Sequence, residues 1–449
     1  MINLKRKKQF AKRFTVILAV TLFTVLLEGT TAFVVNSVSQ TLSELNIEQQ
    51  QVNNDFAELG EYSQTAPNKM AFYENFAYVV ITYENCIQKI DLESGMVRSY
   101  IYLEDSSSPN DILIEGNFAY VSGNSTNKVY KINLENEEVE SSVNVGLAPQ
   151  GLCVVGNDLF VANTGFNIND WTYEPGTLSV IDLNNFAVTD TIAVDLNPAN
   201  MTVVNGKLHV VCTGNYSSVF GKVDIVNLQN YETENILEIG SSPASIAFGN
   251  NGKVYLGNAW PAGVFVYDAE TLQVEITPSD EIFLGGNQLA TNEQFLAVID
   301  AADYIQNSVV RFYDLQNHQL LYQMEVGVGA TDVKFYEPTF ITDNEINDNY
   351  RLYNYPNPFK NSTRISFSIS NEQNKQNEQN TISIYNVKGQ KIRTLECINQ
   401  VDAKATKSLY SIIWNGEDNF GKKVGSGVYY YQLKTGAKIS KLKKMIYIR

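Results

Sequence analysis

The stretch that decides the fold contains three short segments, LFVAN (Leu159–Asn163), LSVIDLNN (Leu178–Asn185) and DTIAVDLNPAN (Asp190–Asn200). An apolar run is followed by a polar loop, and a second apolar run ends at Asp182. A turn, a third run and a connection that leads at Pro198 into the next unit complete the stretch. We call this connection the step. Short runs of β-branched and aromatic residues between turn residues favour β-strands. The stretch therefore predicts a unit built from short strands.

The same unit recurs along the chain. Its first strand carries an aromatic or equivalent residue at positions 33, 78, 120, 160, 209, 255 and 297. Its second strand ends in Asp or Asn at positions 46, 91, 133, 182, 227, 268 and 314. A helical repeat would need apolar residues at i, i+3, i+4 and i+7, which Leu178–Asp182 lacks. A period of about 40–50 residues with about four strands per unit is typical of a β-propeller, so we predict seven blades over residues 33–337.

The closure of the ring is also predicted. The segment Thr331–Tyr336 (TDVKFY) resembles the innermost strands Gly151–Val155 and Ser245–Phe248, and the first unit lacks such a strand because it begins at Phe33. We expect Thr331–Tyr336 to complete the first blade and to remove an exposed sheet edge. The aromatic position of each unit is expected to pack between blades, where burial is worth roughly 1.5–3 kcal/mol per side chain.

These repeats resemble those of the YVTN-type seven-bladed propellers of bacterial surface and secreted proteins. LFVAN (Leu159–Asn163) and VYLGN (Val254–Asn258) stand in the place of the YVTN signature. The resemblance implies the fold, and it says little about function, because one fold serves many functions.

The start of the chain, residues 1–32, has the features of a secretory signal peptide. Basic residues in Met1–Arg13 precede an apolar run, Phe14–Leu27, and the small residues Gly29–Ala32. The alternative is a membrane anchor, but the run is shorter than the roughly 20 residues that span a bilayer. We expect export with cleavage near Ala32 and no stable membrane span afterwards.

Charge is distributed unevenly along the chain. Residues 33–340 carry a formal charge of −29, and residues 341–449 carry +8. Nucleic-acid binding draws most of its affinity from Lys and Arg at phosphates, so the propeller is not expected to bind nucleic acid. Its field would favour cations or basic surfaces, although solubility alone also explains it.

The four cysteines, Cys86, Cys153, Cys212 and Cys397, are too scattered for a disulfide framework. Cys153 and Cys212 lie in apolar strand runs, which favours buried free thiols. A bridge is also compatible with export.

The repeat stops after Glu337, and residues 338–352 form a polar linker. Residues 353–449 follow as a second unit with strands expected at Arg364–Ser370, Thr381–Val387, Lys391–Leu395, Tyr410–Trp414, Gly427–Lys434 and Lys443–Ile448. Short strands at this spacing predict a small β-sandwich, with Asn371–Asn380 as a hairpin loop.

Five motifs in this tail resemble the C-terminal sorting domain of type IX secretion substrates, which is similar to the immunoglobulin-like module of flagellar hook-capping proteins. They are Tyr355-Pro356-Asn357-Pro358-Phe359, Ile384–Arg393, Trp414-Asn415-Gly416, Gly425–Tyr430 with Gly427, and Lys444–Arg449. The resemblance implies that the tail is a sorting signal that the type IX secretion machinery recognises. It implies a secreted or outer-surface protein of a double-membrane bacterium. Lys360-Asn361 departs from the Asn-Pro that is frequent there.

Catalytic motifs are scarce. The sequence has no G-x-S-x-G, H-E-x-x-H or P-loop pattern and no Cys/His cluster. Of its two histidines, His209 occupies an interblade position and His318 lies in a turn. The recurrent Asp and Asn residues at strand ends are expected to cap turns.

One face of the propeller is the candidate binding site. Because strands alternate in direction, the proline-led steps and the loops between the first two strands of each unit emerge on the same side. The candidates at this channel mouth and its rim are Asn68, Asn110, Asp111, Gln150, Asn200, Gln288, Asp332, Trp171, Tyr173 and Trp260. Amides with aromatic neighbours fit a glycan, a peptide or another polar ligand. The alternative is that the amides satisfy backbone groups and the aromatics cover the blades.

No metal or cofactor is expected at the mouth. Ca²⁺ takes about 6–8 oxygen ligands, and only Asp111 and Asp332 supply carboxylates there, while Lys69 would oppose a cation. The sequence favours an exported protein that binds a glycan, peptide or protein and is not an enzyme. The alternatives are a lactonase-like or quinoprotein-like propeller enzyme and a structural envelope component.

Overall fold

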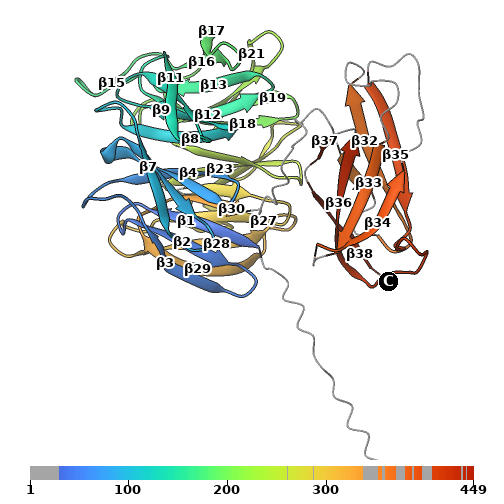
Figure 1. Ribbon diagram of the computed structural model, residues 1–449. Coiled ribbons are helices and arrows are strands. Elements are labelled where there is room, and N and C mark those ends of the chain that lie inside the picture. The colour runs from blue at the N-terminus through green and yellow to red at the C-terminus, as the bar shows by residue number, and fades with distance from the viewer. Residues whose placement is uncertain are drawn as a thin grey trace, which may run out of the picture.

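The computed structural model describes residues 30–336 except 260 and 287, and then residues 352–355, 359–370, 380–386, 389–396, 407–435, 438–440 and 442–448. Seven four-stranded antiparallel sheets are arranged around a central axis, which confirms the seven-bladed β-propeller (Figure 1). Each of these sheets is one blade, in which neighbouring strands pair with each other. Among the described residues, no helix has the length and apolarity to cross a membrane.

Each blade runs from an innermost strand at the channel to an outermost strand. In that order, the first blade contains β30 (Ala330–Tyr336), β1 (Thr31–Asn36), β2 (Thr41–Asn46) and β3 (Gln51–Glu58), and the second contains β4 (Pro67–Tyr73), β5 (Phe76–Ile81), β6 (Cys86–Asp91) and β7 (Val97–Tyr102). The third contains β8 (Pro109–Glu115), β9 (Phe118–Gly123), β10 (Lys128–Asn133) and β11 (Glu138–Asn144), and the fourth contains β12 (Pro149–Val155), β13 (Asp158–Asn163), β16 (Thr177–Asp182) and β17 (Ala187–Ala193). The last three are β18 (Pro198–Val204), β19 (Lys207–Cys212), β20 (Lys222–Asn227), β21 (Thr233–Glu238); β22 (Ser245–Phe248), β23 (Lys253–Ala259), β24 (Ala262–Asp268), β25 (Val274–Ile276); and β26 (Leu289–Thr291), β27 (Phe295–Asp300), β28 (Asn307–Asp314), β29 (Leu320–Val328).

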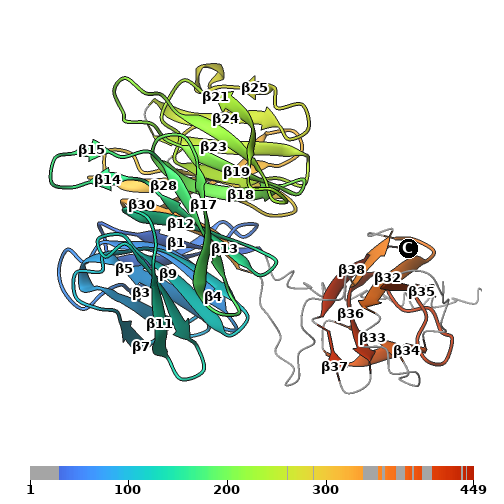
Figure 2. The ribbon, with the colours of Figure 1, turned by 90° about the horizontal axis from the view of Figure 1, so that it is seen from above.

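Short additional elements lie in the loops of the ring. The hairpin β14 (Phe166–Asn167) and β15 (Thr172–Tyr173) interrupts the fourth blade and projects from the ring (Figure 2). The 3-10 turns η1 (Thr82–Glu84) and η2 (Pro278–Asp280) lie in the second blade and before the seventh.

The interblade positions form the core of the ring, as predicted from the repeat. All seven of these residues are buried, and they are Phe33, Tyr78, Tyr120, Phe160, His209, Tyr255 and Ala297. Each lies in the second strand of its blade, where both faces of the sheet are covered by neighbouring blades. Continuous burial of these strands explains why they read as apolar runs instead of alternating patterns.

The ring closes as the sequence predicts. Strand β30 pairs with β1, with Tyr336 opposite Thr31 and Val333 opposite Val34. The last strand of the ring therefore completes the first blade and removes its free edge. Strand β1 begins at Thr31, and Ala32 is fully buried, so the strand includes the last two residues of the segment expected to be removed with the leader.

The recurrent Asp and Asn residues cap the turns between third and fourth strands, as predicted. Asp268 Oδ1, for example, accepts hydrogen bonds from the backbone N–H groups of Glu270 and Thr271, at 3.1 and 2.8 Å. The other six residues accept equivalent hydrogen bonds from backbone N–H groups two or three positions later. These six are Asn46, Asp91, Asn133, Asp182, Asn227 and Asp314. These residues are therefore structural.

The tail forms two further sheets. One contains β31 (Leu352–Tyr355), β32 (Thr363–Ser370) and β35 (Lys407–Trp414); the other contains β34 (Lys391–Glu396), β33 (Asn380–Asn386), β36 (Gly427–Thr435), β37 (Lys438–Ile439) and β38 (Lys443–Tyr447). Residues of both sheets share one buried cluster, including Phe367 and Tyr431. The tail is therefore a small β-sandwich, with two strands, β31 and β37, beyond the six expected.

Motif residues of the tail meet in its core. The ring of Phe359 lies 5.6 Å from that of Trp414 and 5.0 Å from that of Tyr447, measured between centroids. Phe359 N–H also donates to Ile446 O at 2.9 Å. Gly427 begins β36, and Lys444 lies exposed in β38. Tyr355 ends β31, whereas Pro356, Asn357 and Pro358 lie outside the described residues.

Three cysteines are free thiols, as the apolar strand runs indicated for Cys153 and Cys212. Cys86 and Cys212 are buried, and Cys153 is half-buried. Burial raises the pKa of the Cys86 thiol to about 12 and that of Cys153 to about 11, so both stay protonated near neutral pH. Cys397 lies outside the described residues.

Candidate functional site

Five of the seven innermost strands carry a β-bulge where they begin, at one end of the channel. The register of β4 shifts between Pro67 and Met70, and that of β8 shifts between Pro109 and Ile112. Strands β12, β18 and β30 have equivalent shifts. A bulge changes the direction of side chains and is common beside binding sites. In β4, β8, β12 and β18 it follows the proline of the step and turns one residue per blade toward the channel.

The residues at the equivalent position around the ring differ in chemistry. They are Asp332, Lys69, Asp111, Gly151, Asn200, Ser245 and Gln288, in the order of the blades. Five of these seven line the central cavity, namely Lys69, Asp111, Asn200, Gln288 and Asp332. A polar ring therefore marks this end of the channel, which we call the mouth.

The cavity is large enough for a ligand. Its volume is about 570 Å³, within the range of about 300–1,000 Å³ that is usual for ligand sites. Below the polar ring its wall contains the apolar residues Leu113, Ile114, Phe248, Leu289, Val333 and Phe335 together with the polar residues Thr202, Thr291 and Lys334. A second cavity of about 370 Å³ shares Phe248, Thr291 and Phe335 with it. The channel is thus polar at the mouth and has both apolar and polar side chains below it.

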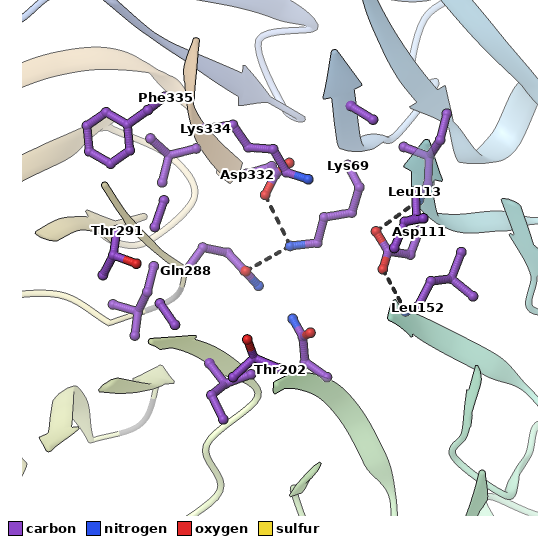
Figure 3. Close-up of a pocket in the computed structure, with 18 of the residues that line it drawn as sticks. Lys69, Asp111, Leu113, Leu152, Thr202, Gln288, Thr291, Asp332, Lys334 and Phe335 are labelled. Carbon is purple, nitrogen blue, oxygen red and sulfur yellow. Dashed lines mark hydrogen bonds and ion pairs between the residues drawn. The ribbon is translucent and has the colours of Figure 1, made fainter. Parts of the chain in front are cut away.

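Lys69 bridges three blades at the mouth. Its Nζ donates to Gln288 Oε1 at 2.8 Å and lies 3.4 Å from Asp332 Oδ1 (Figure 3). Its side chain is only 15% exposed and that of Asp332 only 7%. Burial of an ion pair is tolerated only where further hydrogen bonds satisfy it. Asp332 has such a bond, because its Oδ2 accepts from Met70 N–H at 3.0 Å.

Asp111 lies across the cavity from Gln288 (Figure 3). Its Oδ2 accepts from Leu152 N–H at 3.0 Å and its Oδ1 from Ile112 N–H at 2.9 Å. Burial raises the pKa of the Asp111 carboxyl, Lys334 and Lys69 oppose that shift, and Asp332 adds to it. Two cations and two carboxylates therefore share the cavity.

The ten residues predicted from the sequence divide into groups. Asp111, Asn200, Gln288 and Asp332 come together in the cavity wall. Asn68, Asn110 and Gln150 are half-buried beside it and are not part of the wall. Trp171 and Tyr173 belong to the β14–β15 hairpin, where both rings contact Phe166. Trp260 lies outside the described residues.

Sequence reasoning missed several residues of the wall. Lys334 and Thr202 line the cavity, two residues beyond Asp332 and Asn200 in their strands. The period of two along β30 and β18 could have identified them, because residues i and i+2 share one side of a strand. The apolar residues of the wall carried no signal that separated them from the core.

The loops on the mouth side expose many large apolar side chains. They join the second and third strands of a blade, or one blade to the next. Their exposed apolar residues are Val38, Tyr62, Tyr83, Ile168, Trp171, Tyr216, Val219, Phe220, Ile282, Leu284, Tyr304 and Ile305. In the described turns on the opposite side of the ring, Met96 is the only large apolar residue that is exposed. We call this set of twelve residues the mouth face.

The two histidines have structural partners. His209 Nδ1 lies 2.7 Å from the Tyr267 hydroxyl, and His318 Nε2 lies 2.9 Å from the Tyr255 hydroxyl. Burial lowers the pKa of both imidazoles, that of His209 to about 4. Within the described parts of the chain, no group of three or more His, Cys, Asp or Glu residues could hold a metal ion.

Comparison with known proteins gives a structural similarity only. No family model matches the chain, and no curated protein matches it. Among solved structures 1083 chains match. One is hydrazine synthase from Kuenenia stuttgartiensis, with a TM-score of 0.50, 13% sequence identity, and coverage of 60% of this chain and 88% of that chain. At this identity the similarity supports the propeller-like all-β fold alone.

Proposed function

We propose that this protein is an exported binding protein, and not an enzyme, which engages a glycan, peptide or protein partner through the mouth face. The observation that carries the proposal is the concentration of exposed apolar side chains in loops on one side of the ring. Clusters of exposed apolar residues with polar surroundings mark interaction sites in soluble proteins. Tyr and Trp are among the residues most enriched in such sites.

The charge of the same loops restricts the partner. In their described residues they contain no Lys or Arg. They do contain the carboxylates Glu61, Glu84, Glu104, Asp105, Asp170, Glu174, Asp195, Asp280, Glu281 and Asp303. Complementary charge steers association, so a neutral polar or basic partner fits this face better than an acidic one.

The amides beside the mouth add hydrogen-bonding capacity. Asn68, Asn110 and Gln150 are half-buried, and within the described residues their side chains have no hydrogen-bond partner. An amide can donate and accept, so it can bind hydroxyl groups of a glycan or the backbone of a peptide.

The two carboxylates of the cavity support binding over catalysis. Asp111 and Asp332 each accept a hydrogen bond from a backbone N–H group of the next blade. These bonds hold neighbouring blades together, which is a structural role.

The tail is proposed to be the sorting domain that delivers the protein across the outer membrane through the type IX secretion machinery. The order of its five motifs supports this part of the proposal. Phe359, Trp414 and Tyr447 also pack together in the core, so these motif residues are needed for folding of the tail itself.

Binding is tested with the full-length exported protein on immobilised glycans and on basic and acidic peptides. We expect Trp171→Ala and Ile305→Ala to weaken the strongest signal by about tenfold, since anchor residues cost more than about 1 kcal/mol when truncated. The matched control is Ile236→Ala, because Ile236 is exposed on the outer strand β21, away from the mouth. Equal effects of Ile305→Ala and Ile236→Ala would refute the mouth face as the binding surface.

Export is tested separately. A chain that ends before Leu352 should be retained inside the outer membrane, while the full chain reaches the surface or the medium. Equal export of both chains would disprove the sorting role and would leave the binding proposal intact.

A further inference from the structure

The cavity wall presents hydrogen-bond donors that have no acceptor. Within the described residues, neither the ammonium group of Lys334 nor the hydroxyl of Thr202 has a hydrogen-bond partner, although both residues line the cavity. Lys334 is half-buried in β30 of the first blade, and Thr202 is half-buried in β18 of the fifth blade, on the opposite side of the channel (Figure 3). Both groups therefore remain available to donate a hydrogen bond to a ligand in the cavity.

Two amide groups add to that capacity. Asn200 Oδ1 accepts from Met201 N–H at 2.8 Å, and Gln288 Oε1 accepts from Lys69 Nζ at 2.8 Å. Because both of these partners can only donate, the amide oxygens are fixed and the NH₂ groups face elsewhere. No acceptor for either NH₂ group occurs among the described residues. Asn200 and Gln288 thus also offer donors to the cavity.

The two carboxylates of the cavity already have hydrogen-bond partners. Asp111 accepts from two backbone N–H groups, and Asp332 accepts from Met70 N–H and from Lys69. A ligand with acceptor atoms can use the unpaired donors, whereas a cationic ligand would be repelled by the ammonium groups of Lys69 and Lys334. The chemistry of the unused groups therefore selects an acceptor, and the ammonium group of Lys334 favours one with negative charge.

The remaining wall selects the rest of the ligand. Leu113, Ile114, Phe248, Leu289 and Phe335 also line the cavity, and all of them except Leu289 are half-buried. Covering this apolar surface with a ligand is favourable, because it removes the surface from water. The cavity thus offers a ligand apolar surface as well as hydrogen-bond donors.

We propose that the channel binds an organic carboxylate, with its carboxylate at Lys334, Asn200, Gln288 and Thr202 and its apolar body against Leu113, Phe248 and Phe335. A monoanion fits better than a phosphate dianion, because Asp111 and Asp332 lie in the same cavity and repel the second charge. This site lies inside the ring and goes beyond the binding proposed for the mouth face.

The test is isothermal titration calorimetry on the full-length protein with 4-phenylbutyrate, its neutral amide and inorganic phosphate. We expect 4-phenylbutyrate to bind at least about tenfold more tightly than the amide, because a charge-assisted hydrogen bond exceeds a neutral one in strength. Phosphate should not compete with 4-phenylbutyrate. Equal binding of the amide, competition by phosphate, or no binding by 4-phenylbutyrate would each overturn the proposal.

Two positions locate the site. Lys334→Met keeps the length of the side chain and removes its charge, so it should abolish the preference for the carboxylate over the amide, while Lys334→Arg should retain it. Thr202→Val removes one donor with little change of shape and should weaken binding a few fold, which tests the site even where Lys334→Met does not fold. Unchanged carboxylate binding in a folded Lys334→Met protein would refute the site.

Ile305→Ala separates this site from the mouth face. Ile305 is exposed in a loop and does not line the cavity. We expect it to leave binding of 4-phenylbutyrate unchanged, even where it abolishes binding of a glycan or peptide. Loss of 4-phenylbutyrate binding in this variant would contradict a site inside the ring.

Discussion

Asp332 Oδ2 accepts a hydrogen bond from the backbone N–H of Met70 at 3.0 Å, although the two residues lie 262 positions apart in the chain. The bond joins the innermost strands of the first and second blades, β30 and β4. Asp111 Oδ2 joins the third and fourth blades in the same way, through Leu152 N–H at 3.0 Å. The carboxylates that line the channel are therefore also links between blades.

Asp332→Ala should destabilise the ring. It leaves the buried N–H of Met70 without an acceptor, which costs about 1–3 kcal/mol. Asp332→Asn retains an acceptor oxygen and should cost less. Urea unfolding measures the change, and Asp105→Ala is the control because Asp105 is exposed in a loop. If Asp332→Ala unfolded at the same urea concentration as Asp105→Ala, the link would have no role in stability.

Asp224→Asn should stabilise the protein above pH 7. Asp224 is 1% exposed, its Oδ1 has no hydrogen-bond partner, and burial raises the pKa of its carboxyl to about 6. Because the folded pKa exceeds the unfolded value, ionisation of Asp224 costs stability as the pH rises from about 4 to about 6. The shift corresponds to about 2–3 kcal/mol.

The pH dependence distinguishes this cause from a general effect of the substitution. Thermal unfolding of wild type and Asp224→Asn should differ most above pH 7 and converge near pH 4, where the folded protein holds Asp224 protonated. A stabilisation by Asp224→Asn that is the same at pH 4 and pH 8 would show that ionisation is not its source.

The pair His209 and Tyr267 should make the ring sensitive to acid. His209 is 2% exposed and burial, with a smaller effect of Lys207, lowers the pKa of its imidazole to about 4. Because the folded pKa lies below the unfolded value, the unfolded state takes up the proton first. The stabilising contribution of neutral His209 is complete above about pH 6.5 and is lost as the pH falls toward 4. His209→Phe should therefore lose about 2 kcal/mol less stability than wild type between pH 7 and pH 5.

The same pair gives a test at neutral pH. His209→Phe leaves the buried Tyr267 hydroxyl without its partner and should cost about 1–3 kcal/mol at pH 7. Tyr267→Phe in addition should recover part of that loss, since neither polar group then remains unpaired. Additive losses in the double variant would exclude the coupling.

Gly416→Ala should destabilise the tail more than Gly421→Ala. Both glycines have positive φ, +71° and +78°, so alanine is strained at both by about 1–2 kcal/mol. A Cβ at Gly416 would lie 2.7 Å from Tyr447 Cζ, whereas the space at Gly421 is open. Urea unfolding of the tail should show a clearly larger loss for Gly416→Ala, and equal losses would mean that the Tyr447 ring moves freely.

Much of the fold could be predicted because its signals are local. The interblade positions from Phe33 to Ala297 are mostly apolar or aromatic in the chain itself, and the caps from Asn46 to Asp314 bond within a few residues. The closing strand is recognisable because Thr331–Tyr336 repeats the pattern of the inner strands. A repeated unit makes long-range contacts predictable, since each blade packs on a similar neighbour.

The candidate site could be predicted only in part. Asp111 and Asp332 follow from their place after the steps, but Asn68, Asn110 and Gln150, one position earlier in their strands, are not in the wall. A β-bulge decides which of two adjacent residues faces the channel, and a shift of one residue exchanges the faces of a strand. The sequence of a single strand does not show where that shift in register occurs.

By itself, the sequence determined the number of blades, the closing strand, the turn caps and the sandwich of the tail, because these depend on patterns within one or two neighbouring units. Only the tertiary structure decided which side chains meet in the channel. Lys69, Gln288 and Asp332 come from different parts of the chain, and the curvature of the ring brings them within reach. Which donors remain unused there depends on bonds between blades, and such bonds exist only after the ring has closed.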